Sequence, residues 1–148
     1  MNDKILLSIH RHWIWADRMK ELFEYYLSKE GPLTDFTMMD LFLSSLGTCM
    51  CMWYSLLYAT CDGLQEKGKV NIAGEIDQNY DKVCYELRRF RNATFHVEPQ
   101  LESEKLMVVL KNPDIVPIIR TLHERVGAYL VRQIQQLPAY QKGARESG

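Results

Sequence analysis

A short basic segment in the second half of the chain gathers the side chains best suited to act on a phosphodiester. It contains Arg88, Arg89 and Arg91, followed by Asn92 and His96. Metal-free RNA cleavage needs a base for the 2′-OH proton, an acid for the leaving 5′-oxygen and a cation for the charge on phosphorus. Histidine, with an unperturbed pKa of about 6.5, suits proton transfer, and the planar arginine fork suits phosphate oxygens.

The spacing of these residues limits what one chain can do alone. Arg91 and His96 are five positions apart, so on an ideal helix their side chains would diverge by roughly 140°. They can meet at one phosphate if the helix unwinds between them or if a two-fold dimer brings two copies together. We expect the helix to unwind around residues 92–96. Arginines in a last helical turn also have a structural explanation, because they complement the negative end of the helix dipole.

Hydrophobic periodicity predicts that helices position this segment. Helices are expected over about 4–28, from Thr34 or Asp35 to about Lys67, from Val70 to the basic segment, over about 103–110, and from Asn112 to Pro138. The second is apolar on nearly all sides and should lie at the centre, with Gly47 marking a kink or a close crossing. No period-2 alternation is long enough to predict a sheet. We therefore expect an all-α fold, an antiparallel four-helix bundle with an additional short helix.

Length and composition favour one globular domain. The chain has 148 residues, of which 47% are hydrophobic and 25% are charged, close to average globular usage. We expect a single domain over 1–140, followed by a polar tail over 141–148. The formal net charge is -1, whereas proteins that hold nucleic acid non-specifically usually have a basic excess. Any RNA-binding surface should therefore be a local patch.

The cysteines and the apolar stretches favour a soluble cytoplasmic protein. The four cysteines contain no C-x-x-C pair, which favours reduced core thiols. The N-terminal residues lack a basic region followed by a long apolar run, so we expect no secretory signal. The apolar stretch 41–59 is interrupted by polar residues, and we interpret it as a buried helix instead of a membrane span.

The remaining histidines and the tryptophans have structural interpretations. His10 and His12 are two positions apart and point to different helix faces, so they cannot form an i,i+4 metal pair, and we interpret them as surface or packing residues. We place His123, which lies beside charged residues, on a solvated face. The aromatic side chains of the apolar stretches could stack on bases, but their helical spacing is more typical of a core or a dimer interface. They are Trp13, Trp15, Trp53, Tyr54 and Tyr58. No glycine-rich phosphate loop and no Cys/His cluster with zinc spacing occurs, so we infer neither cofactor nor metal.

The order of two motifs resembles that of a known family. Residues 91–96, R-N-A-T-F-H, resemble the R-x4-6-H motif of the HEPN superfamily, including its frequent polar residue after the arginine. Residues 52–63, M-W-Y-S-L-L-Y-A-T-C-D-G, resemble a central helix of bacterial members that often ends in an acidic residue and a glycine. The resemblance spans roughly residues 4–136. It implies an all-α HEPN-like fold, usually a homodimer whose motifs face each other across the interface.

The resemblance also implies an activity and roles for particular residues. Many members are metal-independent endoribonucleases in toxin–antitoxin, phage-defence or RNA-processing systems. Carried onto this chain, Arg91 would bind the scissile phosphate, His96 would be the acid or base, Asn92 would position them and Asp62 would be a supporting acid. RNA, a second copy of the chain, and a cognate antitoxin or another partner protein are the partners that follow.

Other functions stay open beside this one. Some toxin members carry a tyrosine two residues after the histidine, which their antitoxin modifies, whereas this chain has Glu98 there. Members without catalysis exist, and the near-neutral charge fits a non-catalytic HEPN module that binds a nucleotide, RNA or a partner protein. Arg88 and Arg89 are further candidates for substrate binding, together with Asp62. In a plain helical interaction domain, by contrast, the arginines would only form a solvated helix end.

Overall fold

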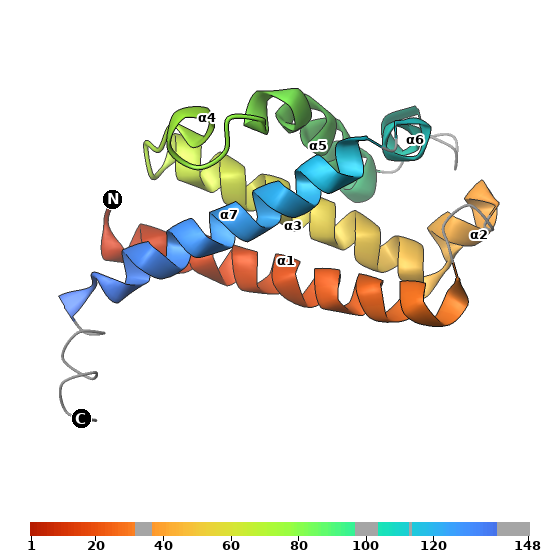
Figure 1. The fold of residues 1–148 in the computed structure, drawn as a ribbon, viewed down its shortest axis with the longest axis horizontal. Coiled ribbons are helices and arrows are strands. Elements are labelled where there is room, and N and C mark those ends of the chain that lie inside the picture. The colour runs from red at the N-terminus through yellow and green to blue at the C-terminus, as the bar shows by residue number, and fades with distance from the viewer. Residues whose placement is uncertain (32–36, 97–103, 113, 139–148) are drawn as a thin grey trace.

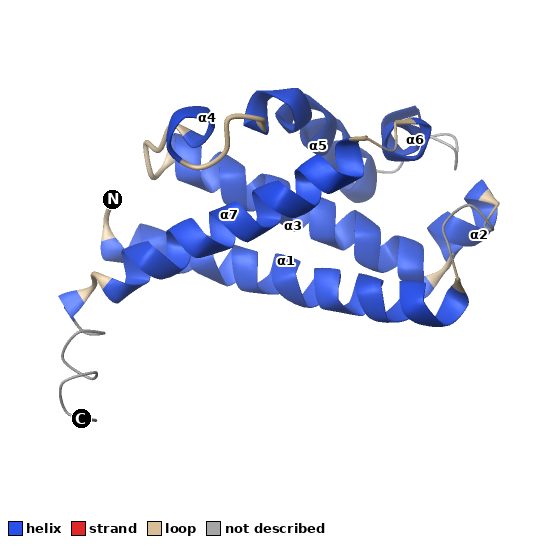
Figure 2. Ribbon diagram, in the orientation of Figure 1, coloured by secondary structure: helices blue, strands red, loops and turns tan. Residues whose placement is uncertain are grey.

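Helices account for all of the regular structure in the described chain. The computed structural model describes residues 1–31, 37–96, 104–112 and 114–138, and these ranges contain no strand (Figure 2). The elements in chain order are α1 (Asp3–Glu30), α2 (Met38–Leu43), α3 (Ser45–Glu66), α4 (Ile72–Glu75), α5 (Tyr80–Phe95), α6 (Glu104–Lys111) and α7 (Ile115–Gln135). The all-α prediction is confirmed, whereas the regular four-helix bundle and the HEPN-like fold stay predictions. The expected tail over 141–148 lies outside the described residues.

Helix α3 lies between α1 and α5, in keeping with the central position expected from its apolar sequence. It packs along α1 and against α5, while α7 crosses α1 and also contacts α5 (Figure 1). Of the short helices, α2 contacts α3, α4 contacts α3 and α5, and α6 contacts α5. No described helix combines the length and the apolar character that crossing a membrane requires. Because α3 touches both α1 and α5, residues from three separate parts of the sequence share one surface.

Helix α1 covers nearly its predicted range because its cap, its apolar stripe and its terminal glycine agree. The Asn2 side chain accepts a hydrogen bond from the Lys4 backbone N–H at 2.8 Å, which caps the first turn. Gly31 follows the last turn with a φ of 93°, a conformation that favours glycine. The stripe that faces the core consists of Leu6, Ile9, Ala16 and Phe23.

The helix predicted over about 34–67 is wrong in one respect, because it is interrupted at Ser44. The Ser44 hydroxyl donates to the Leu41 carbonyl at 2.7 Å and accepts from the Gly47 N–H at 3.0 Å, so one side chain ends α2 and caps α3. A Cβ at Gly47 would lie 1.8 Å from the Leu41 carbonyl oxygen, so the backbones of α2 and α3 approach closely at the position where a kink or a close crossing was expected. The candidate caps at positions 34 and 35 lie outside the described residues, and Thr37 caps α2.

The helix predicted from position 70 onward is also divided, into α4 and α5. In the connection, Asp77 accepts a hydrogen bond from the Asn79 N–H at 2.9 Å. Asp77 is buried, and it also forms an ion pair at 3.1 Å with Arg125 of α7. Ile76 and Tyr80 keep helical spacing across this break, so periodicity alone could not reveal it.

His123 is buried at the crossing of α1, α3 and α7, so its predicted place on a solvated face is wrong. Its side chain is only 2% exposed, and its Nε2 lies 2.9 Å from an Asp17 carboxylate oxygen. The Trp53 indole N–H donates to His123 Nδ1 at 3.2 Å. Because the indole can only donate, Nδ1 accepts and the hydrogen of the neutral ring is on Nε2, facing Asp17. Trp13 adds a hydrogen bond of 3.2 Å from its indole to the His123 carbonyl.

The cysteines fit the expected core thiols. All four are free; Cys49 and Cys61 are buried, and Cys51 and Cys84 are half-buried. Burial raises the pKa of Cys51 to about 11, so this thiol stays protonated near neutral pH. A protonated thiol is a poor nucleophile and a poor metal ligand.

Replacing Gly47 with alanine tests the crossing between α2 and α3. The new Cβ would collide with backbone, which cannot move aside as a side chain can, so we expect Gly47→Ala to lower the free energy of unfolding by about 3 kcal/mol. Urea denaturation followed by circular dichroism measures this. Ser45→Ala, at an exposed position in the same turn, is the matched control and should change stability by no more than about 0.5 kcal/mol. Equal stabilities of the two variants would contradict the close crossing.

The buried His123 should make the fold sensitive to mild acid. Burial is the main cause that lowers the pKa of His123 below its ordinary 6.5, although Asp17 opposes the shift. Below that value the unfolded chain binds a proton that the folded chain does not, so the stability present above pH 6.5 is lost as the pH falls. We expect the free energy of unfolding to decrease from pH 7 to pH 5, and His123→Gln to reduce that slope. His10, whose pKa burial also lowers, contributes in the same direction in both proteins. Identical pH slopes in the wild type and His123→Gln would contradict the lowered pKa of His123.

Candidate functional site

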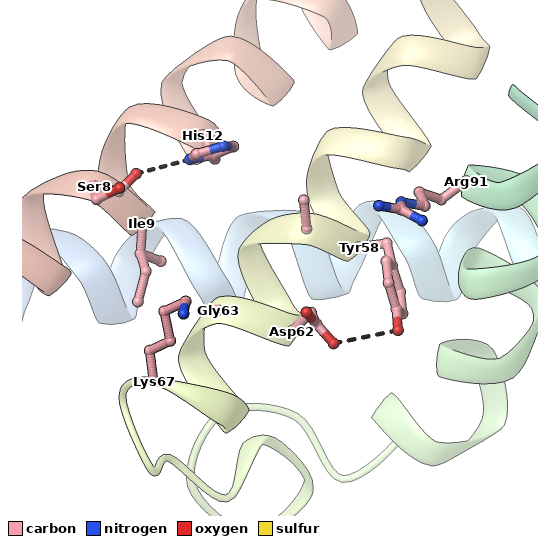
Figure 3. Close-up of a pocket in the computed structure, with 9 residues that line it drawn as sticks. Ser8, Ile9, His12, Tyr58, Asp62, Gly63, Lys67 and Arg91 are labelled. Atoms are coloured by element: carbon pink, nitrogen blue, oxygen red, sulfur yellow. Dashed lines mark hydrogen bonds between the residues drawn. The ribbon is translucent and has the colours of Figure 1, made fainter. Parts of the chain in front are cut away.

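A surface pocket of about 210 Å³ is formed by residues of α1, α3 and α5. Figure 3 shows α3 passing between the other two helices, with the lining side chains on either side of it. The residues that line the pocket are Ser8, Ile9 and His12 of α1, Tyr58, Ala59, Asp62 and Gly63 of α3, Lys67 just after α3, and Arg91 of α5. The pocket therefore combines two cations, a carboxylate, a histidine and a phenol with four apolar or small residues.

Small residues on α3 make room for the pocket and bring α1 close. Ala59 and Gly63 are one helical turn apart on the same side of α3. A Cβ at Gly63 would lie 3.1 Å from Ile9 Cγ1, which is tighter than an ordinary van der Waals contact. The glycine therefore lets α1 approach α3 at this level.

Tyr58 and Asp62 form a hydrogen-bonded pair on successive turns of α3. The Tyr58 hydroxyl donates to an Asp62 carboxylate oxygen at 3.3 Å (Figure 3). Burial raises the pKa of Tyr58, the negative charge of Asp62 raises it further, and Arg88 and Arg91 act in the opposite direction. The phenol therefore stays protonated at neutral pH and helps to hold the carboxylate in place.

Arg91 is exposed on α5 and reaches the pocket, and among the described residues it forms no ion pair. Its Nη1 donates to the Asn92 side-chain oxygen at 3.0 Å, and its guanidinium carbon lies 6.0 Å from the centre of the Phe95 ring. Both partners are uncharged, so these contacts orient the guanidinium without neutralising it. This geometry suits the positioning role that the resemblance implies for Asn92, and it leaves donors for an anionic ligand.

His12 enters the pocket from α1 with one ring nitrogen already engaged. Its Nδ1 lies 2.9 Å from the Ser8 backbone carbonyl oxygen (Figure 3). A carbonyl oxygen can only accept, so Nδ1 is the donor in this bond and the neutral ring carries its lone pair on Nε2. The Trp15 ring, with its centre 5.3 Å from that of His12, packs against the imidazole.

The structure separates His96 from this pocket. Helix α5 does not unwind at Asn92, because the ladder continues to the His96 N–H, which bonds to the Asn92 carbonyl at 3.0 Å. The expectation of an unwound segment is therefore wrong, and His96 is the exposed residue that follows the last turn. Because the helix is continuous from Arg91 to Phe95, successive side chains point about 100° apart around its axis. His96 is not among the residues that line the pocket.

The two other arginines of the basic segment take different positions. Arg88 is exposed one turn before Arg91, and its charge acts on Tyr58. Arg89 is half-buried instead, with its Nη1 3.5 Å from a Glu86 oxygen and its guanidinium 5.6 Å from the Tyr85 ring centre. Arg89 is therefore engaged on its own helix and does not line the pocket.

Sequence reasoning missed three ionisable side chains of this pocket. His12 and Lys67 lie far from the basic segment in the sequence, and Tyr58 was interpreted as a core or interface aromatic. The spacing of Tyr58 and Asp62 could have revealed the tyrosine, since residues four apart lie on the same helix face. Nothing local indicates that α1 faces α5 across α3, so His12 had no signal of its own.

No metal centre is indicated in the part of the chain that the structure describes. Within it, no group of three or more His, Cys, Asp or Glu side chains is placed to hold a metal ion.

Comparisons with known proteins do not assign the chain to a family. No protein-family model matches it, no curated protein matches it, and no solved structure matches its fold. The function must therefore be argued from the pocket itself.

Proposed function

We propose that this protein is a metal-independent endoribonuclease of the HEPN type that acts as a homodimer. The observation that carries the proposal is the pocket that Arg91 and Asp62 share, although they belong to different helices. The HEPN resemblance implies both as site residues, and it does so from motifs that are separate in the sequence. Arg91 would bind the scissile phosphate, His96 would transfer a proton and Asn92 would orient the arginine. A toxin–antitoxin or phage-defence role in the cytoplasm is part of the same proposal.

The charges around the pocket support a single phosphodiester as the ligand. Arg91 and Lys67 contribute two positive charges and Asp62 one negative charge, and the exposed Arg88 lies one turn from Arg91. The local excess of cations contrasts with the net charge of -1 for the whole chain. Binding should therefore depend on this patch, with weak attraction for long RNA elsewhere on the surface.

The position of His96 supports a dimeric site. Because α5 stays helical up to Phe95, Arg91 and His96 of one chain do not converge by unwinding. The two residues can instead converge across a dimer, if a two-fold axis brings the histidine of one protomer towards the arginine of its partner. A homodimer with the ends of α5 facing each other would complete the proposed site.

A non-catalytic phosphate-binding module is the second candidate. It is favoured by the same exclusion of His96 from the pocket, because a single chain then holds the phosphate-binding cations without this proton donor. Such a module would bind a nucleotide or an RNA end without turnover. Cleavage and binding experiments separate the two candidates.

RNA cleavage in EDTA is the direct test of the proposed activity. We expect the wild type to cut single-stranded RNA and leave 2′,3′-cyclic phosphate ends, and His96→Ala and Arg91→Ala to lower the rate by about 10²- to 10⁴-fold. Arg89→Ala is the matched control, since Arg89 is engaged with Glu86 and Tyr85, and it should cut like the wild type. Circular dichroism confirms equal folding. Unchanged cleavage in both the His96 and the Arg91 variant would refute the assignment.

The salt dependence of RNA binding counts the phosphate contacts. Each phosphate contact to single-stranded RNA contributes about 0.7 to the slope of log affinity against log salt concentration. Because both cations hold one phosphodiester, Arg91→Ala and Lys67→Ala should each reduce the slope by at most about 0.7, whereas Arg89→Ala should leave it unchanged. Fluorescence anisotropy with a labelled oligoribonucleotide between 50 and 200 mM salt, roughly the range over which such affinities change most, measures this. Equal slopes for all three variants would show that the pocket does not hold the phosphates.

A further inference from the structure

The proposed cleavage needs two proton-transfer groups, and the HEPN motif supplies only one histidine per chain. A base must remove the 2′-OH proton, and an acid must protonate the departing 5′-oxygen. His96 can fill one of these roles. The pocket that holds Arg91 contains a second histidine, His12, which comes from the opposite end of the sequence.

The tautomer of His12 suits it to be the base. Its Nδ1–H is committed to the Ser8 carbonyl at 2.9 Å, which leaves the Nε2 lone pair for a ligand. A backbone carbonyl within a helix is a fixed acceptor, so the ring is oriented before any substrate arrives. The same arrangement stabilises the imidazolium that forms after proton uptake, because Nδ1–H continues to donate to Ser8.

The neighbours of His12 place it near the phosphate. Arg91 and Lys67 line the same pocket of about 210 Å³, so a phosphodiester held by these cations fills a space that His12 also borders. Asp62, held by Tyr58 at 3.3 Å, adds a carboxylate that offsets part of the positive charge. His12 is half-buried, which leaves its ring accessible to a ligand in the pocket.

We propose that His12 is the general base of this site and that Lys67 is its second phosphate-binding cation. The proposal rests on the ribonuclease function proposed above. His12 Nε2 takes the proton of the 2′-OH as its oxygen forms a bond to phosphorus. The bond from phosphorus to the 5′-oxygen breaks, and its electron pair stays on that oxygen. The His96 imidazolium, the acid, donates a proton to the same oxygen. The products are a 2′,3′-cyclic phosphate and a 5′-OH.

His10 provides a matched control on the same helix. It lies two residues from His12, its ring stacks on Trp13 with centres 6.0 Å apart, and burial lowers its pKa. It is not among the residues that line the pocket. Replacing each histidine in turn therefore separates a role in the pocket from a general effect of losing a histidine on α1.

The first experiment measures cleavage of a single-stranded oligoribonucleotide in EDTA by folded, full-length protein. His12→Gln should lose about 10²- to 10⁴-fold in rate, with RNA affinity within about threefold of the wild type, a change below 1 kcal/mol. His10→Gln should cut like the wild type. Added imidazole should partly restore His12→Ala but not Arg91→Ala. If His12→Gln cuts RNA at the wild-type rate while Arg91→Ala is inactive, the inference is overturned and the ribonuclease function stands.

The second experiment does not depend on cleavage. A 2′-deoxy analogue of the same oligonucleotide lacks the attacking hydroxyl, and it is added to protein with ¹³C-labelled histidines. The Cε1–Hε1 resonance of His12 should shift in the wild type and stay in place in Arg91→Ala and Lys67→Ala. If the wild type cuts no RNA, the ribonuclease function and the base role of His12 both fail, while a shifted His12 resonance still supports the shared phosphate pocket. An unmoved His12 resonance overturns the inference in every case.

Discussion

The hydrogen bond between the Trp53 indole and the buried ring of His123 is the interaction on which the arrangement of the long helices depends. It joins α3 to α7 at 3.2 Å, and Asp17 joins the same ring to α1 at 2.9 Å. Buried polar groups need hydrogen-bond partners. Removing one member of the network leaves its partners unpaired, at a cost of about 1–3 kcal/mol for each unpaired group. Lys20 and Arg120 lie over the Trp53 ring, 5.9 and 5.7 Å from its centre, at the outer edge of this network. The relative position of α1 and α3 is therefore specified by directional bonds as well as by apolar contact.

The pocket is a consequence of that packing. Once α1 is fixed along α3, His12 lies near the face of α3 that carries Tyr58 and Asp62, and Gly63 permits the close approach to Ile9. Helix α5 packs on the other side of α3 and adds Arg91. Sites built on packed helices hold their side chains more firmly than sites built on loops. The residues around this pocket come from three helices that also contribute to the hydrophobic core, and Ile9 belongs to both.

The proposed chemistry divides its tasks among those helices. Helix α5 supplies a phosphate-binding arginine oriented by Asn92, the end of α3 supplies Lys67 and a carboxylate held by Tyr58, and α1 supplies an imidazole oriented by Ser8. His96 lies at the end of α5, outside the pocket, so in this proposal a second protomer completes the site. A small patch of cations on a chain with a net charge of -1 fits selective binding to one phosphodiester.

The sequence by itself determined the helical class, the extents of α1 and α7 and the close approach of the chain at Gly47. These features depend on local spacing, capping and glycine, which a sequence displays directly. Arg91 and Asp62 became candidate site residues through the resemblance of their motifs to the HEPN family. Only the tertiary structure decided the breaks at Ser44 and near Asp77, the burial of His123 and the presence of His12 in the same pocket as Arg91. The bonds of His123 to Trp53 and Asp17 join residues 70 and 106 positions apart. A periodic pattern shows which face of a helix is apolar, but not which other helix that face will meet.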